Sequence, residues 1–167
     1  MKKILVLDEK DYDTNLESIY RIAVRGIIFV DGKLLLIQSA KGEIKFPGGG
    51  QEANEDDLTT LTREVLEETG YHILENTVRE LGEVEEIRLS KEGKVWHQIS
   101  HYYFCDISRK QTTCSYTESE QTLGFRQVWL TLEQAIDANR QMLKQGIPEP
   151  WVNREYKVLE LLQKELI

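Results

Sequence analysis

Residues 49–71 read GGQEANEDDLTTLTREVLEETGY, a glycine-led loop followed by one amphipathic helix. Three apolar residues in this stretch have the i, i+3, i+7 spacing of one helical face: Leu58, Leu61 and Val65. Asp56 or Asp57 is a suitable N-cap, and Gly70 provides the left-handed residue that commonly follows a helix. The pattern therefore predicts a helix that docks its apolar stripe on a core.

Three glutamates, Glu64, Glu67 and Glu68, share another face of this helix. Like charges at this spacing disfavour a helix by roughly 0.2–0.5 kcal/mol per pair. Anions near a helix C-terminus cost about 0.3–1 kcal/mol each. The glutamates project away from the apolar stripe, so burial is not expected to explain them. Taken alone, they are better explained as a solvated face; the alternative is a divalent cation, which prefers carboxylate and carbonyl oxygens.

The residues around the helix favour the cation. Glycine occupies residues 48–50, and a glycine run lets backbone groups approach a metal or a phosphate closely. Glu55 lies where the loop meets the helix, and Arg63 can fix nearby carboxylates by forked hydrogen bonds. The glycine run lacks the Lys-Ser/Thr ending of a P-loop, so its meaning depends on this combined spacing.

The combined spacing resembles the signature of the Nudix hydrolases, a family of MutT-like enzymes: G-x5-E-x7-R-E-U-x-E-E-x-G-U, where U is a bulky apolar residue. The chain matches its fixed positions in register: Gly49, Glu55, Arg63, Glu64, Val65, Glu67, Glu68 and Gly70. Tyr71 departs from the usual aliphatic last position, and Asn54 replaces a glycine that often precedes the first glutamate. The resemblance implies an α/β fold, the Nudix α/β/α sandwich with a central mixed β-sheet.

The resemblance also implies hydrolysis of a phosphoanhydride (pyrophosphate) bond in a nucleoside diphosphate linked to another moiety, with Mg²⁺ or Mn²⁺ as the cofactor. Divalent ions neutralise the charges of such an anhydride and lower the pKa of bound water. Glu64 and Glu68 are the implied principal ligands, Glu67 is a ligand or close helper, and the Gly48 carbonyl is another ligand. Glu64 is a candidate base for the attacking water, although a loop carboxylate can take that role in this family.

Other residues are expected to support these glutamates or to hold the substrate. Arg63 and Glu55 are implied to orient the metal ligands. Gly49 is expected to let a substrate phosphate approach the backbone. Arg25 is a charged residue in an apolar strand and Lys45 precedes the Phe-Pro-Gly loop, so both are candidate phosphate clamps. For Lys45, a plain surface position is the alternative.

Family members often add an acidic ligand from beyond the signature. Residues 116–125, ahead of Trp129, contain two candidates. Glu120 is preferred as a metal ligand and Glu118 is the alternative, while either could be a solvated loop acid.

Two other groups of residues are not assigned to the site. His97 and His101 are four apart in an expected strand, which separates them by about 13 Å and argues against a metal pair. Four aromatic residues could stack on a nucleobase, although core packing explains them better: Tyr102, Tyr103, Phe104 and Trp151.

The remaining pattern predicts alternating strands and helices. Strands are expected at residues 3–7, 21–30, 33–38, 81–89, 95–107 and 125–130. Asp31-Gly32 is a hairpin turn signal, and Thr131 is the expected cap of a helix over 132–144. A final amphipathic helix is expected over 153–166. The first apolar run is too short for a signal peptide and is interpreted as a strand.

The whole chain is expected to form one domain, 1–167, of an ordinary globular protein. Its net charge of −8 argues against general nucleic-acid binding, while the resemblance implies a small nucleotide-type substrate. Cys105 and Cys114 form no disulfide framework and fit a reducing cytoplasm. No membrane span is expected, and a homodimer is compatible with the sequence.

The sequence leaves the substrate open among nucleoside triphosphates, nucleotide sugars and RNA 5′ ends, of which RNA is the least favoured by charge. Residues 86–89 lack the proline or tyrosine that suggests ADP-sugar or dinucleoside polyphosphate activity in this family. A Nudix-like sensor that binds a nucleotide without turnover is the main rival, but such proteins typically lose glutamates that this chain keeps. An acidic interaction domain without metal is a third reading.

Overall fold

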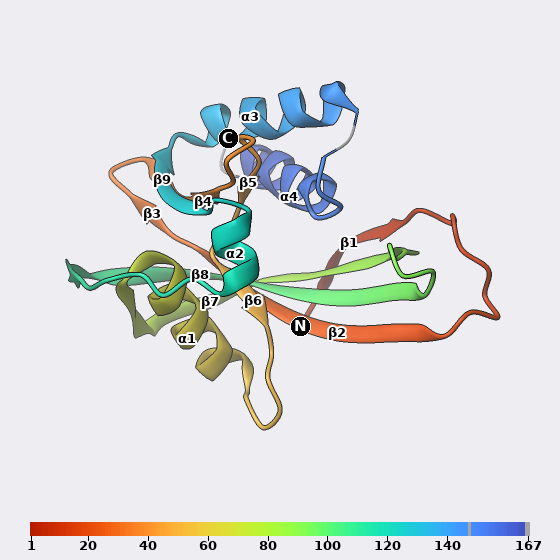
Figure 1. Ribbon diagram of the computed structural model, residues 1–167. Helices are drawn as coiled ribbons and strands as arrows, with labels where there is room; N and C mark the ends of the chain where they lie inside the picture. The colour runs from red at the N-terminus through yellow and green to blue at the C-terminus, as the bar shows by residue number, and fades with distance from the viewer. Residues whose placement is uncertain (147, 166–167) are drawn as a thin grey trace.

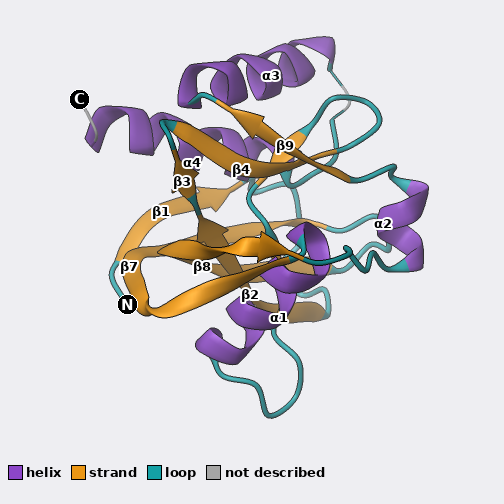
Figure 2. Cartoon of the chain, turned by 90° about the vertical axis from the view of Figure 1, so that its left-hand side faces the viewer, coloured by secondary structure: helices purple, strands orange, loops and turns teal. Residues whose placement is uncertain are grey.

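The computed structural model describes residues 1–146 and 148–165. It places two β-sheets between helix α1 (Asp57–Thr69) on one side and helices α3 (Leu132–Gln145) and α4 (Val152–Glu165) on the other (Figure 1 and Figure 2). This is the layered α/β arrangement with a central mixed sheet that the sequence predicts.

The larger sheet contains β1 (Lys3–Asp8), β2 (Ser18–Ile27), β6 (Gly48–Gly50), β7 (Tyr71–Leu89) and β8 (Val95–Gln111). Its strand order is β1-β7-β8-β2-β6. The β1–β7 and β2–β8 pairs are parallel, whereas the β7–β8 and β2–β6 pairs are antiparallel. The sheet is therefore mixed, and its β6 edge brings the glycine run beside β2.

The smaller sheet is antiparallel and contains β3 (Phe29–Val30), β4 (Lys33–Gln38), β5 (Ile44–Lys45) and β9 (Arg126–Leu130). Strand β9 pairs with β4 from Leu34 to Gln38, so β3 and β5 share the opposite edge of β4. The turn between β3 and β4 has positive φ at Asp31 and Gly32, 49° and 75°. These values confirm the predicted hairpin turn.

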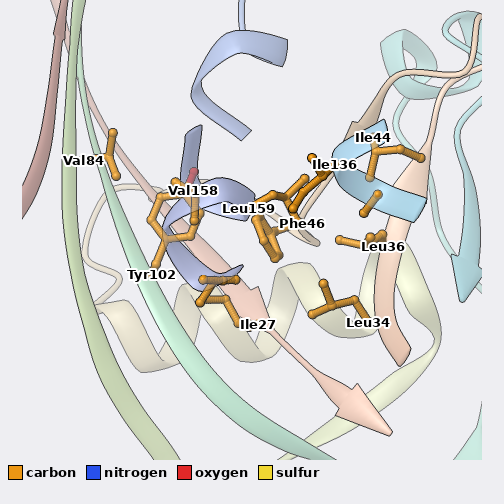
Figure 3. Close-up of a cluster of buried hydrophobic side chains, with 12 residues drawn as sticks. Ile27, Leu34, Leu36, Ile44, Phe46, Val84, Tyr102, Ile136, Val158 and Leu159 are labelled. Carbon is orange, nitrogen blue, oxygen red and sulfur yellow. The ribbon is translucent and has the colours of Figure 1, made fainter. Parts of the chain in front are cut away.

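Two hydrophobic cores lie on opposite sides of the sheets. We call one the α3–α4 core, and its members include Ile27, Leu34, Leu36, Phe46, Tyr102, Ile136, Val158 and Leu159 (Figure 3). We call the other the α1 core, which consists of Val24, Ile28, Leu35, Leu61, Val65, Ile73 and Cys105 with their partly buried neighbours. Successive side chains of a strand point to opposite faces, so β4 contributes Leu34 and Leu36 to one core and Leu35 to the other.

Strand β2 alternates in the same way and makes room for α1. Ile27 faces the α3–α4 core, and Val24 faces the α1 core. A Cβ at Gly26 would lie 3.2 Å from Val65 and 3.3 Å from Leu61. The absence of a side chain at Gly26 therefore lets α1 pack close to the sheet.

The helix ends follow the predicted capping residues. The Asp56 side chain accepts a hydrogen bond from the backbone N–H of Thr59 at 2.8 Å, so Asp56 is the N-cap of α1. Gly70 ends this helix with φ of 72°. Thr131 caps α3 in a reciprocal arrangement with Gln134.

Several element boundaries differ from the prediction. The strand expected over 21–30 is interrupted at Ile28, where the chain passes from the larger to the smaller sheet. Strand β7 begins at Tyr71 rather than at residue 81. Part of the expected loop 116–125 forms the short helix α2 (Glu118–Thr122).

Two further details concern helices. Leu58 is 38% exposed, so the predicted apolar stripe of α1 buries Leu61 and Val65 but not Leu58. The end of the last helix predicted at residue 166 lies outside the described residues, which place α4 at 152–165. None of the helices within the described residues is long and apolar enough to cross a membrane.

Candidate active site

The glycine run lies directly under the acidic face of α1. Gly48 pairs with Arg25 and has φ of 142°; a Cβ there would be 2.0 Å from the carbonyl oxygen of Val24. A Cβ at Gly49 would be 2.4 Å from Oε1 of Glu64. Glycine is therefore required for β6 to pair with β2 while a carboxylate of the helix rests on it.

Arg63 joins the loop before α1 to the helix. Its Nε and one terminal nitrogen donate to the two carboxylate oxygens of Glu55 at 2.7 and 2.9 Å. Its other terminal nitrogen donates to Glu64 at 2.7 Å, and the terminal nitrogen that pairs with Glu55 also donates to the Gly50 carbonyl oxygen at 3.1 Å. Hydrogen bonds from Arg63 lower the pKa of Glu55 to about 2. The structure thus brings together the predicted supports and a predicted metal ligand.

Glu68 is buried against the first glycine of the run. Its Oε2 accepts the backbone N–H of Gly48 at 2.7 Å, and its Oε1 accepts from the Lys45 ammonium group. Burial raises the pKa of Glu68 to about 7, although Lys45 acts in the opposite direction. The charged form of this carboxylate is therefore incompletely compensated.

The expectation that burial does not explain the glutamates is wrong for two of them. Glu64 is 8% and Glu68 is 1% exposed, because β6 and its neighbours cover the face that points away from the apolar stripe. Glu67 is partly exposed and lies 3.4 Å from Arg63. Burial raises the pKa of Glu67 as well, and the charges of Glu64 and Glu120 add to this effect.

Two cationic side chains meet at the carbonyl oxygen of Gly48. Lys45 donates to it at 3.2 Å, and Arg25 donates to the same oxygen. Arg25 is 6% exposed, and its Nε has no hydrogen-bond partner among the described residues. Both predicted clamps therefore lie at the glycine run, and Arg25 retains an unused donor there. Lys45 is buried rather than a plain surface lysine.

The late acidic candidates differ in position. Glu120 accepts the backbone N–H of Thr117 at 2.8 Å in the capping box of α2. Burial raises the pKa of Glu120, but hydrogen bonds from Thr117 outweigh it, and Lys45 and Glu68 are close enough to contribute. Glu118 is exposed at the start of the same helix. The arrangement favours Glu120 over Glu118 as the residue nearer the site.

The donor set fits a divalent cation. Its carboxylate and carbonyl oxygens are the hard donors that such ions take in proteins. The Lys45 ammonium group lies between Gly48 and Glu68, so a positive charge is already accommodated between two implied ligands. Over residues 1–146 and 148–165, no three acidic, His or Cys side chains converge to chelate one ion in this arrangement. Binding of a cation here would require Lys45 and Arg63 to release the carboxylate oxygens of Glu68 and Glu64.

Two residues near the site were missed by sequence reasoning. Glu155 of α4 accepts the backbone N–H of Phe46 at 2.9 Å, and thereby holds the segment that enters the glycine run. The guanidinium of Arg21 lies at Gly50, where a Cβ would be 2.6 Å from it. Arg21 and Arg25 lie four apart in β2 and share a face, which was an available signal. Glu155 had no local signal.

The residues not assigned to the site behave largely as predicted. His97 contacts Glu85 at 2.9 Å and His101 contacts Asp57 at 2.7 Å, so the two histidines have separate partners. Tyr102 is fully buried in the α3–α4 core, as predicted, whereas Trp151 is only partly buried and lines a cavity, so core packing does not explain it.

The model of the NUDIX domain matches residues 19–151 of the chain. Similar solved structures include a NUDIX hydrolase from Nitrosomonas europaea, at 19% identity and a TM-score of 0.57, which covers 83% of this chain and 87% of that one. A MutT NUDIX hydrolase from Burkholderia pseudomallei is 20% identical with a TM-score of 0.57, and the match covers 85% of this chain and 97% of that one. At these identities the likeness shows the fold. None of the curated proteins matches the chain.

Proposed function

The chain belongs to the NUDIX domain family, whose members hydrolyse phosphoanhydride bonds, and we propose a function on this basis. We propose that the protein cleaves the pyrophosphate bond of a nucleoside diphosphate that is linked to another moiety. The family generally uses divalent metals, and Mg²⁺ or Mn²⁺ is the proposed cofactor. One observation carries the proposal: carboxylates of α1 lie on the glycine strand, Glu64 at Gly49 and Glu68 at Gly48.

Each residue of the site has a proposed role. The cation would be held by the following groups: Glu64, Glu67, Glu68, Glu120 and the Gly48 carbonyl. Such an ion, when bound, neutralises anhydride charge and lowers the pKa of bound water. Glu64 is proposed to orient and deprotonate the attacking water. Arg63 and Glu55 restrict the Glu64 carboxylate to one orientation, because Arg63 is hydrogen-bonded to both of them.

Arg25 and Lys45 are proposed to bind the substrate phosphates. Both donate to the carbonyl oxygen of Gly48, so two positive charges lie where the chain runs closest to the helix. An unpaired buried donor such as Nε of Arg25 costs roughly 1–3 kcal/mol. A phosphate oxygen would satisfy it and form a charge-assisted bond. The expected approach of a phosphate to Gly49 is not part of this proposal, because the Glu64 carboxylate occupies the space that the missing Gly49 side chain leaves.

The proposed substrate is a small nucleotide-type molecule in the cytoplasm. A net charge of −8 repels long polyanions, whereas a single diphosphate needs only the local cations described above. Cys105 and Cys114 are free cysteines, which suits a reducing compartment.

A hydrolysis panel tests this function. The pure protein with Mg²⁺ or Mn²⁺ is expected to turn over at least one class among nucleoside triphosphates, nucleotide sugars and dinucleoside polyphosphates. Glu64→Gln should lower turnover by roughly a hundredfold or more, as expected for a lost base. Glu133→Gln, the same change at an exposed position of α3, is the matched control and should keep the wild-type rate.

Other outcomes separate the rival functions. Metal-dependent nucleotide binding without turnover would identify the protein as a nucleotide sensor rather than an enzyme. If the protein neither binds nor hydrolyses any of these nucleotides, the proposal is contradicted, and the acidic interaction domain is the function that remains. Equal activity in the Glu64 and Glu133 variants would remove Glu64 from the reaction.

A further inference from the structure

A cavity of 240 Å³ lies beside the turn between β7 and β8, next to the start of α4. Its aromatic lining residues are Trp96 of β8 and Trp151, which immediately precedes α4. Arg88 of β7, which pairs with Glu86 at 2.7 Å, and Lys91, which pairs with Glu149 at 3.5 Å, offset the lining acids Glu92 and Glu149. The volume is below the roughly 300–1,000 Å³ of a site for a drug-sized ligand, so the cavity suits one ring system of a larger molecule.

Two arginines flank the indole ring of Trp96. Cζ of Arg21 lies 5.8 Å from the ring centroid and Cζ of Arg88 lies 5.4 Å from it. These arginines come from β2 and β7, the strands on either side of β8. Within the described part of the chain, Arg21 has this contact but no hydrogen bond or ion pair. It is exposed and can therefore move to meet a ligand.

The indole nitrogen of Trp96 is an unmet donor. Nε1 is shielded from solvent, yet it has no hydrogen-bond partner among the described residues. Buried donors of this kind are rare in folded proteins. A ligand acceptor that enters beside Trp96, with a small displacement of the exposed Arg21 side chain, would satisfy this N–H.

Two sets of contacts connect the cavity with the proposed catalytic site. Nζ of Lys45 lies 4.9 Å from the centroid of Phe125, and Phe125 packs edge-on against Trp151 with centroids 6.3 Å apart. Arg21 provides the second connection, because its guanidinium extends from Trp96 to Gly50. A substrate with its phosphates at the glycine run can therefore place another part in this cavity.

We propose that the cavity between Trp96, Trp151 and Arg88 binds the nucleobase of the substrate. The inference rests on the proposed function, because it is the diphosphate at the glycine run that directs the base toward this cavity. Indole faces and guanidinium planes stack on any base, and the Trp96 N–H can donate to an acceptor on the base edge. Arg21 lies between the two ends and is positioned to contact the phosphate nearest the nucleoside.

A second cavity is less suitable for a base. It has a volume of 270 Å³, lies between α1 and β7, and includes Asp56, Asp57 and Glu75 in its lining. These negative charges oppose a nucleotide. The hydroxyl of Tyr103 in this cavity already donates to Asp57 at 2.5 Å. Charge and aromatic content therefore favour the Trp96–Trp151 cavity.

Tryptophan fluorescence tests the base site without turnover. The metal-free protein is titrated with AMP, GMP, CMP and UMP, and with ribose 5-phosphate as the base-free probe. At least one nucleoside monophosphate is expected to quench the emission, and ribose 5-phosphate is not. Trp96→Phe and Trp151→Leu should each weaken the affinity about tenfold. Trp151→Leu changes a partly exposed residue and keeps the test valid if Trp96→Phe folds poorly.

Trp129→Phe is the matched control, because Trp129 lies on β9 against Tyr71 and should not affect the titration. Three outcomes would overturn the base site: no quenching by any monophosphate, equal quenching by ribose 5-phosphate, or the same loss of affinity in the Trp129 variant. Binding at Trp96 without hydrolysis of any substrate would refute the proposed function alone. Hydrolysis without base-dependent quenching would refute the base site alone.

Discussion

Arg63 orients Glu64 of α1 and is itself held by Glu55, which precedes the helix. Its guanidinium is shared by Glu55 in the loop and Glu64 in α1, and it also reaches the Gly50 carbonyl. If the ion pair between Glu55 and Arg63 were lost, Arg63 would be free to move toward Glu64 and Glu67. The geometry of the site thus depends on an ion pair that need not touch the substrate.

The pKa of Glu55 makes this ion pair visible in a stability measurement. Arg63 holds that pKa at about 2, below the ordinary value of 4.5. The ionised carboxylate therefore stabilises the folded protein above about pH 4.5, and this contribution is lost as the pH falls toward 2. Glu55→Gln should melt at a lower temperature than wild type at pH 7, and the difference should narrow at pH 3.

Glu52→Gln is the control for this comparison, since Glu52 is an exposed acid of the same loop. The Glu52→Gln variant should have the same melting temperature as the wild type at both pH values. A melting difference for Glu55→Gln that is the same at pH 7 and pH 3 would contradict the role of the charge.

At this scale, the sequence predicts side chains whose spacing repeats a fixed pattern and misses those assembled by tertiary contacts. Glu64, Glu68 and Arg63 could be predicted because one helix sets their separation. The burial of Glu68 could not, because it depends on Lys45 and Gly48 from a different part of the chain. The partners of Arg25 also depend on strand pairing that the sequence alone does not specify.

Among the elements, α4 supports the glycine run from the opposite side of the sheet. Glu155 accepts hydrogen bonds from the Phe46 backbone at 2.9 Å and the Tyr102 hydroxyl at 3.0 Å. Arg154 donates to the same carboxylate and to Glu86 at 2.6 Å. The segment between β5 and β6 is therefore fixed by a buried charged network.

Glu155→Gln should weaken both folding and catalysis. Removing one partner of a buried ion pair costs about 3–5 kcal/mol, because the Arg154 charge is left poorly compensated. At temperatures where the variant is folded, kcat should fall roughly ten- to a hundredfold as the glycine run shifts. Chemical denaturation and steady-state kinetics measure the two effects.

Glu165→Gln, an exposed change on the same helix, is the control for α4 and should alter neither quantity. Unchanged kcat in a folded Glu155→Gln protein would show that α4 does not position the run. A rise in KM with an unchanged kcat would point instead to an effect on substrate binding.

Elements with strong end signals are the ones that the sequence predicts well. Helices α1 and α3 are marked by Asp56, Thr131 and a glycine after the last turn. The first half of β7 was missed because the few apolar residues of 71–80 do not alternate regularly, and the pairing with β8 shifts register between Leu74 and Arg79. Helix α2 is short, and its only signal was the Thr117–Glu120 capping box.

For the molecule as a whole, the layered fold follows from the resemblance and from alternating apolar residues. The sequence alone did not reveal that β4 supplies both hydrophobic cores. Leu34 and Leu35 are adjacent and fully buried, yet they belong to different cores. The cores share one strand, so we expect them to unfold together.

Leu159→Ala tests this coupling. Leu159 is fully buried in the α3–α4 core, and its truncation should lower the free energy of unfolding by about 2–5 kcal/mol. Leu58→Ala changes a leucine that is 38% exposed and should cost no more than about 0.5–1 kcal/mol. Urea denaturation should give one transition by both fluorescence and circular dichroism; two separate transitions would indicate that the cores fold independently.

The double role of β4 also limits how the chain can change in length. Inserting or deleting one residue in β4 would turn every following side chain to the opposite face, so that the linings of the two cores would be exchanged. The connection over residues 9–17 lies between β1 and β2 and carries no such constraint. Length variation in related chains is therefore expected to accumulate in that connection, while β4 keeps a constant number of residues.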